Sequence, residues 1–260
     1  MSARRLDYQL TAYDALVILF LLGSLISARL VGVVSAEGLF LSLLGAFVAV
    51  SVYSVMRRGS GGSDGSMGLR RKFPHLIGGS VLLLGLIWYP TDLPFLVSTL
   101  FATYLLYEVL RWQVVKRRTW TSHLLSFYGS PEEESGRPFW EAILGLGSIC
   151  FILHLFDAEI AMVSMINLTF GDGVAGLTRE ILRENARSFG ARKGWWGSIA
   201  GTVTSSALVL ALTGKAAYLI PVALGMLIER LPIPVEDNLT VSLSTALCAW
   251  LLSRQGPSSA

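Results

Sequence analysis

The sequence has few charged residues and almost no cysteine. Charged side chains make up 15% of its 260 residues, against about 25% in an ordinary soluble domain, so a soluble one- or two-domain protein is not expected. Cys150 and Cys248 are its two cysteines, and both lie within apolar stretches, which supports neither a disulfide framework nor a metal cluster. The net charge of +3 is too small to indicate a nucleic-acid partner.

Long hydrophobic runs, in contrast, are abundant, and 53% of the residues are hydrophobic. A helix that crosses a bilayer needs about 20 mostly apolar residues. Such stretches are expected at residues 14–34, 36–56, 73–90, 94–112, 139–157, 159–177, 195–213, 216–231 and 238–254. The pattern predicts an all-α, polytopic integral membrane bundle of about nine transmembrane helices. Residues 1–260 form one domain, with N-terminal helices and a Gly/Ser linker over 1–69.

The positive charges are distributed unevenly between the two ends of these predicted spans. If the N-terminus lies inside, the 21 Lys and Arg residues fall on cytoplasmic loops or helix ends, except for Arg29, Lys215 and Arg254. Because basic segments resist translocation, this distribution predicts an N-terminus inside and a C-terminus outside. The inner loops are long and interrupted by glycine, so we expect any chemistry at the cytoplasmic face.

A first polar cluster, Arg70-Arg71-Lys72-Phe-Pro74-His75, marks the start of the third predicted span. Pro74 suits the first turn of a helix, and cations beside a helix N-terminus favour anion binding. The positive-inside rule alone also explains the basic residues. His75 lies within an apolar helix, where its ring needs a partner, either on another helix or on a ligand.

A second cluster, Gly171-Asp172-Gly173-Val-Ala175, closes the sixth predicted span. A carboxylate there costs up to a few kcal/mol unless it is paired, hydrated or bound to a cation, so Asp172 is a candidate functional residue. Its small neighbours let another helix or a phosphate approach closely. The run also matches the dinucleotide fingerprint Gly-x-Gly-x-x-Gly, but that fingerprint opens a helix after a strand, so we reject this interpretation.

The basic loop after this span leads into the seventh predicted span, and its candidate phosphate-binding groups are Arg192, Lys193 and nearby backbone amides. Trp195 and Trp196 follow directly after this loop. Such an aromatic pair is typical of an anchor at the membrane interface. Stacking of one ring on a nucleobase is the alternative.

A third cluster, Glu236-Asp237-Asn238, begins the last predicted span at the same face. Asp237 could simply cap that helix. Together with Asp172, however, these side chains supply the hard oxygen ligands that Mg²⁺ prefers. Cations for phosphates, carboxylates for Mg²⁺ and a group that orients a hydroxyl are the components of phosphoryl transfer. A nucleotide would enter from the cytosol and a lipid alcohol from the bilayer.

The combined elements resemble the integral-membrane, CTP-dependent lipid kinases, which include dolichol kinase, phytol kinase and the CTP-dependent diacylglycerol kinase. The resemblance spans residues 70–245 and lies in Arg71-Lys72-x-x-His75, Gly171-Asp172-x-x-Ala175 with Phe189-Gly190, Lys193-x-x-x-Gly197-Ser198-x-Ala-Gly201, and Asp237-Asn238-Leu-Thr240. It implies CTP as phosphoryl donor, Mg²⁺, and a nucleotide site around Asp172 and the following loop. Where the family commonly has Lys-Ser-x-Glu-Gly-Ser, Gly194 and Trp196 replace the hydroxyl and the carboxylate, so the nucleotide preference stays open.

The expected activity is transfer of the γ-phosphate of CTP to the hydroxyl of a dolichol-, polyprenol- or phytol-like isoprenoid alcohol, or of diacylglycerol. The expected catalytic or metal-binding residues are Asp172, Glu236 and Asp237, any of which could be the base, with His75 positioning groups. The expected nucleotide-binding residues are Arg71, Lys72, Gly171, Gly173, Ala175, Gly190, Arg192, Lys193, Gly197, Ser198 and Asn238. The alternatives are a membrane cytidylyltransferase that joins CTP to a lipid phosphate, and a cation- or proton-coupled transporter.

Overall fold

The computed structural model of the chain is helical, with no strand in the part that it describes. That part comprises residues 67–113, 140–182, 194–231, 233 and 235–255, with isolated positions between 19 and 35. The predicted span 36–56 lies outside the described residues, and 14–34 is described only at those isolated positions.

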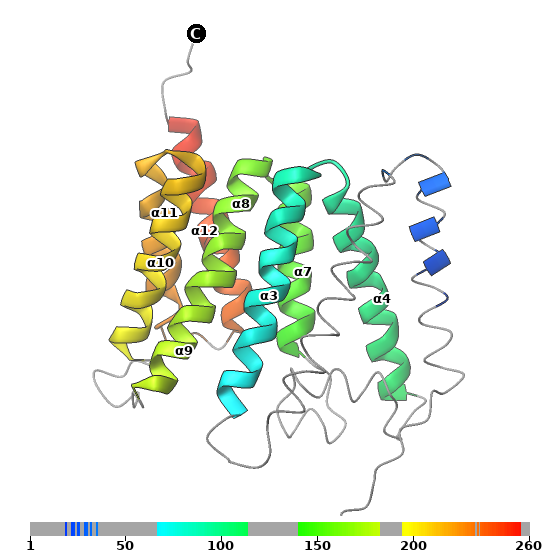
Figure 1. Cartoon of the computed structure of the whole chain (residues 1–260), viewed down its shortest axis with the longest axis horizontal. Helices are drawn as coiled ribbons and strands as arrows, with labels where there is room; N and C mark the ends of the chain where they lie inside the picture. Colours follow the sequence, from blue (N-terminus) through cyan, green and yellow to red (C-terminus); the bar gives the residue numbers. More distant parts are fainter. Residues whose placement is uncertain are drawn as a thin grey trace, which may run out of the picture.

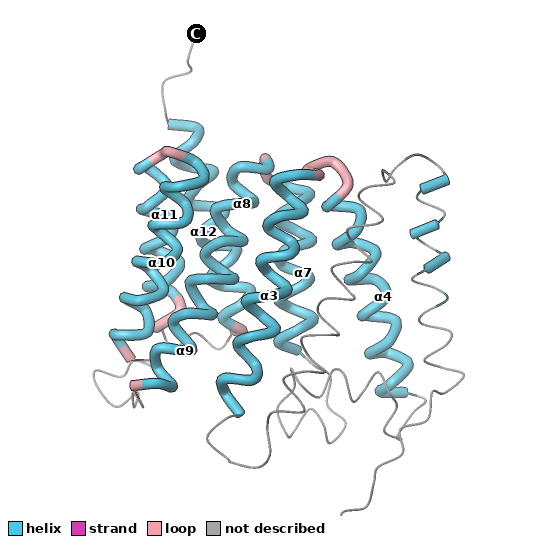
Figure 2. Tube along the Cα trace, in the orientation of Figure 1, coloured by secondary structure: helices cyan, strands magenta, loops and turns pink. Residues whose placement is uncertain are grey.

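Helices lie at all seven remaining predicted spans and run side by side (Figure 1 and Figure 2). They are α3 (Met67–Trp88), α4 (Leu93–Gln113), α7 (Trp140–Leu155), α8 (Ala158–Ile166), α9 (Gly173–Ile181), α10 (Trp195–Thr213), α11 (Leu219–Ile228) and α12 (Asp237–Gln255).

The start of α3 differs from the sequence-based prediction. The helix begins at Met67, inside the predicted linker, so Pro74 lies within α3 rather than in its first turn. The expectation was wrong because hydropathy marks only the apolar part of a helix, whereas the polar residues that precede Phe73 continue the same helix. Pro74 has no N–H for the carbonyl four residues earlier, so one backbone hydrogen bond is missing there.

The sixth predicted span is one continuous helical segment whose middle is widened. Between α8 and α9, residues Asn167–Asp172 form a π-helical segment, η2. Such segments insert an extra residue per turn and are frequent at functional sites. Asn167 helps to hold this one, because its Nδ2 donates to Thr245 Oγ1 at 2.8 Å and to the Val222 carbonyl oxygen at 3.2 Å. No periodicity in the sequence indicated η2.

The centre of the bundle is α8, which contacts α3, α7, α10 and α12. Ile160, Val163 and Ile166 of α8 are buried against Ile152 of α7 and Val222 of α11 in one hydrophobic core. α4 packs on α7 and lies on the far side of the bundle from α10 and α11 (Figure 1).

The three polar clusters of the sequence lie at one end of the bundle. Here α3, α10 and α12 begin while α9 and α11 end (Figure 1), and we call it the Asp172 end. At the opposite end, Asp92 accepts hydrogen bonds from the Ser35 backbone N–H at 3.0 Å and from Ser35 Oγ at 2.6 Å.

Two of the described segments, Ala158–Ile181 and Trp195–Thr213, are long and apolar enough to cross a membrane, judged by length and composition. They differ in burial, because 72% of the first but only 28% of the second is buried inside the protein. The all-helical prediction is thus confirmed for the described residues, whereas the count of nine spans stays a prediction.

Candidate functional site

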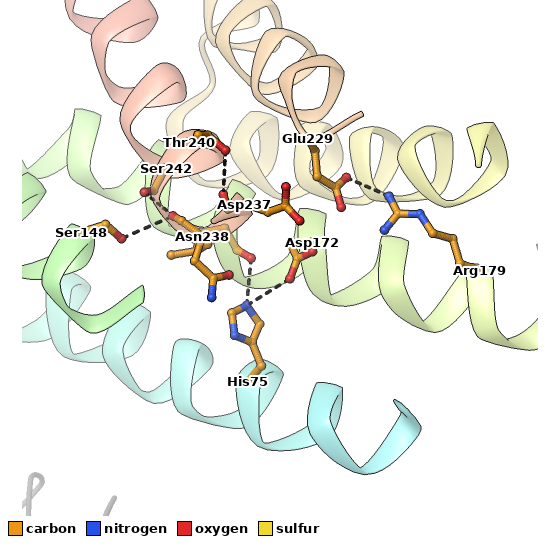
Figure 3. A network of polar contacts seen from close by, with 10 residues as sticks. His75, Ser148, Asp172, Arg179, Glu229, Asp237, Asn238, Thr240 and Ser242 are labelled. Carbon is orange, nitrogen blue, oxygen red and sulfur yellow. Dashed lines mark hydrogen bonds and ion pairs between the residues drawn. The ribbon is translucent and has the colours of Figure 1, made fainter. Parts of the chain in front are cut away.

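His75 of α3 reaches across to η2 at the Asp172 end. Its Nε2 lies 3.0 Å from the carbonyl oxygen of Leu168. Because a carbonyl oxygen can only accept, this ring nitrogen carries the proton and donates it. The same Nε2 is 3.9 Å from Asp172 Oδ2 (Figure 3), which is too long for a hydrogen bond but close enough for a charge interaction. The predicted need of His75 for a polar partner is therefore met by another helix.

Asp172 ends the π-helical segment and is only 4% exposed. The widened turn aims its carboxylate toward α3, where His75 approaches it. Its neighbour Gly173 faces Leu76 of α3, since a Cβ there would meet Leu76 Cδ2 at 2.6 Å. α3 and the end of η2 are therefore in close contact beside the carboxylate.

The glycines around Asp172 are accounted for by helix packing. A Cβ at Gly201 of α10 would collide with the Gly171 carbonyl oxygen, and one at Gly197 would meet the Ala175 carbonyl oxygen at 2.7 Å. A Cβ at Gly171 would lie 2.9 Å from Ser205 Oγ, and Ala175 is fully buried. Protein atoms thus lie where a side chain would stand at Gly171, Gly197 and Gly201.

A buried ion pair that the sequence reasoning missed ties three helices together. Glu229, directly after α11, is completely buried, and its Oε2 accepts a hydrogen bond of 2.9 Å from the Arg179 guanidinium of α9 (Figure 3). The same Nη2 lies 3.3 Å from Ser198 Oγ of α10. Glu229 follows an apolar run as Asp172 does, so the argument that singled out Asp172 could also have found it.

A second guanidinium lies against the start of α10. The Arg230 guanidinium carbon is 3.2 Å from the centroid of the Trp195 ring. Arg230 is 6% exposed, whereas Trp195 is 52% exposed. Such stacking is a favourable cation–π contact and gives the ring a fixed orientation.

The third sequence cluster lies where α12 begins. Asp237 occupies its first turn, where a carboxylate favours the helix dipole. In Figure 3 its carboxylate points toward Asp172, and α12 is in contact with η2. The Asn238 carbonyl oxygen accepts from Ser242 Oγ at 2.6 Å. Glu236 precedes the helix, and its carbonyl oxygen accepts the Thr240 N–H at 3.1 Å.

Several predicted phosphate-binding residues have no described side chain. Arg71 and Lys72 lie on the first turns of α3, but the structure describes only their backbone. Gly190, Arg192 and Lys193 lie outside the described residues. Among the residues that the structure does describe, no group of three or more His, Cys, Asp or Glu side chains is arranged to hold a metal ion.

Comparisons with known proteins give no match. No protein-family model, no characterised protein and no solved structure is similar to the chain at a significant level. The family resemblance therefore depends on the sequence motifs alone.

Proposed function

We propose that the chain is an integral membrane lipid kinase that transfers the γ-phosphate of CTP to the hydroxyl of an isoprenoid alcohol or of diacylglycerol. The observation that carries the proposal is the position of Asp172, a buried carboxylate on a π-helical segment, with His75 beside it and the start of α12 in contact. The three motif clusters of the sequence, more than 60 residues apart in the chain at their closest pair, thus contribute to one end of the bundle.

The exposed face of α10 supports a membrane location. This helix is apolar over its length, yet only 28% of it is buried. Beyond Trp195, its exposed large side chains are Trp196, Ile199, Val203, Leu210 and Leu212. Monomeric soluble proteins rarely expose so continuous an apolar surface, whereas lipid tails cover it without cost. We extend the proposal to the whole chain, which then has nine spans, an N-terminus inside and its site at the cytoplasmic face.

The carboxylates differ in what they can offer a metal ion. Glu229 is paired with Arg179, so we assign Mg²⁺ binding to Asp172 and Asp237. Mg²⁺ is usually bound by one or two carboxylates together with substrate phosphates and water, so a pair of protein ligands fits its chemistry. When bound, the ion neutralises charge that develops on the phosphoryl group.

The remaining residues are assigned to positioning. Arg71, Lys72, Arg192 and Lys193 hold the phosphates, and a carboxylate at the Asp172 end orients the acceptor hydroxyl and takes its proton. The acceptor oxygen forms a bond to the γ-phosphorus, the bond from that phosphorus to the β–γ bridging oxygen breaks, and CDP leaves. His75 fixes α3 on η2 through its bond to the Leu168 carbonyl.

The test uses purified protein in detergent with magnesium, isoprenoid alcohols, diacylglycerol, lipid phosphates, and CTP labelled at the α or the γ position. Recovery of the γ label in the lipid fraction is expected and identifies the acceptor. Recovery of the α label would contradict the kinase and favour a cytidylyltransferase.

A lack of transfer from CTP, ATP and GTP would also overturn the proposal. Ion or proton flux into proteoliposomes without nucleotide would then favour a transporter, in which Asp172 carries the ion.

A further inference from the structure

Trp195 and Trp196 are neighbours in sequence but lie in different surroundings. The Arg230 guanidinium stacks on the Trp195 ring at 3.2 Å from its centroid, and Arg230 is itself almost fully buried. Trp196 is 63% exposed and points elsewhere, since successive helical residues are about 100° apart. The pair therefore does not act as one membrane anchor.

The contact with Arg230 leaves Trp195 as a rigid, partly open ring. One face is covered by a guanidinium plane held by the protein, and 52% of the residue stays exposed. An interface anchor needs no such support, because lipid headgroups accommodate a Trp ring in many orientations. A stacking surface does benefit, because a ring that is already ordered loses little entropy when a flat ligand binds.

Trp195 lies at the same end of the bundle as Asp172. Trp195 begins α10, and Gly197 just after it packs on the carbonyl of Ala175, one helical turn from Asp172. Ser198 on the same turn contacts Arg179. The first turn of α10, which carries Trp195, thus contacts α9 through Arg179 and the backbone of Ala175.

We propose that the open face of the Trp195 ring stacks on the base of the nucleoside triphosphate, with Arg230 supporting the opposite face. This inference rests on the proposed function, since it assigns the base-binding part of that site. Every nucleobase has a π face, so a stacking platform adds affinity without selecting the base. Trp195 then contributes similarly to the binding of CTP, UTP and ATP.

The test compares Trp195→Ala with Trp196→Ala in the full-length protein, in detergent with magnesium. Binding is measured for CTP and for inorganic tripolyphosphate, which carries the phosphates without a base. Trp195→Ala is expected to weaken CTP binding about 10-fold, as base–aromatic stacking typically contributes, and to leave tripolyphosphate binding unchanged. Trp195→Phe keeps most of the affinity, and Trp196→Ala behaves like the parent protein.

Steady-state kinetics give an independent readout. Trp195→Ala should raise KM for CTP by a similar factor and leave kcat at saturating CTP unchanged, because stacking is the same in the ground and transition states.

Two results would contradict the stacking role of Trp195 without contradicting the proposed kinase activity. In the first, Trp195→Ala does not change CTP binding. In the second, Trp195→Ala weakens the binding of CTP and of tripolyphosphate equally, which indicates a structural role for Trp195. If the parent protein binds neither CTP nor tripolyphosphate, the proposed function fails and the platform fails with it.

Discussion

At the scale of single residues, three carboxylates gather near the Asp172 end, and each is held differently. Glu229 is completely buried and paired with a guanidinium, Asp172 is nearly buried beside an imidazole, and Asp237 lies in the first turn of a helix. A buried charge is tolerated only with such compensation. These different surroundings indicate a structural role for Glu229, whereas we assign Asp172 and Asp237 to the reaction.

The first prediction concerns Asp172→Asn, which keeps the size of the side chain and removes its charge. If Asp172 binds Mg²⁺ or orients the acceptor, phosphate transfer to lipid should fall below detection while the thermal unfolding midpoint in detergent stays within a few degrees. The charge is also costly to bury, so stability is not expected to fall. A variant that keeps a near-normal rate would remove Asp172 from the catalytic assignment.

The second prediction concerns the buried pair of Arg179 and Glu229. Glu229→Gln leaves a guanidinium without its counter-charge, and breaking a buried pair from one side costs about 3–5 kcal/mol. The midpoint of unfolding should therefore drop strongly. The double variant Arg179→Gln with Glu229→Gln should recover part of the loss, and strict additivity in this double-mutant cycle would show that the two side chains do not interact.

The third prediction concerns pH at the opposite end. The Lys215 ammonium lies 2.8 Å from the Glu159 carboxylate, and this hydrogen bond outweighs burial and raises the pKa of Lys215 above its usual 10.5. A raised lysine pKa stabilises the fold below about 10.5 and loses that contribution as pH rises through the folded-state value. Thermal unfolding of Lys215→Gln should thus differ slightly from the parent at pH 8, and the two should converge as pH rises through the raised pKa of Lys215.

At the scale of elements, the close approach of α10 to η2 and α9 positions the site. Gly201 and Gly197 let the α10 backbone reach the carbonyls of Gly171 and Ala175. From the sequence, the small residues beside Asp172 could admit either another helix or a phosphate. The packed helices show that α10 approaches the backbone at Gly171 and Ala175.

The fourth prediction compares two alanine substitutions in helices. At Gly201 the new Cβ would meet the Gly171 carbonyl oxygen, whereas at Gly78 of α3 it meets nothing within 4 Å. Gly201→Ala should destabilise by about 1–3 kcal/mol through overpacking and reduce activity. Gly78→Ala should be neutral or stabilise by up to about 1 kcal/mol through helix propensity. Equal effects on the unfolding midpoint would contradict the packing argument.

At the scale of the whole molecule, burial and hydropathy separate two kinds of apolar helix. The segment Ala158–Ile181 is mostly enclosed by its neighbours, whereas only 28% of the apolar stretch of α10 is buried. An enclosed apolar helix is equally stable in the core of a soluble protein. It is the outward-facing apolar surface of α10 that favours a bilayer around the bundle.

The fifth prediction tests that surface. Val203 is 63% exposed in the middle of α10, so Val203→Lys should oppose membrane insertion by about 3 kcal/mol if lipid covers this face. The amount of protein in alkali-washed membranes should fall. Ser253→Lys, an exposed position near the end of α12, is the control and should leave the amount unchanged. If Val203→Lys leaves it equally unchanged, lipid does not surround α10.

The sequence by itself determined the helices. Apolar runs of the right length predicted the seven helical segments from residue 73 onward, because burying the backbone in an apolar setting requires its hydrogen bonds to close within a helix. It also singled out His75 and Asp172, because a charged or polar group in such a run needs compensation. Asp237 was singled out as an oxygen ligand suited to Mg²⁺.

Only the tertiary structure decided how those residues combine. The π-helical segment depends on Asn167 reaching Val222 and Thr245, and the pairing of Glu229 with Arg179 joins positions 50 residues apart. Hydropathy is a property of one segment of sequence, so it cannot indicate which distant residues form a hydrogen bond or an ion pair. The support of the Trp195 ring by Arg230 likewise exists only once the end of α11 is packed beside the start of α10.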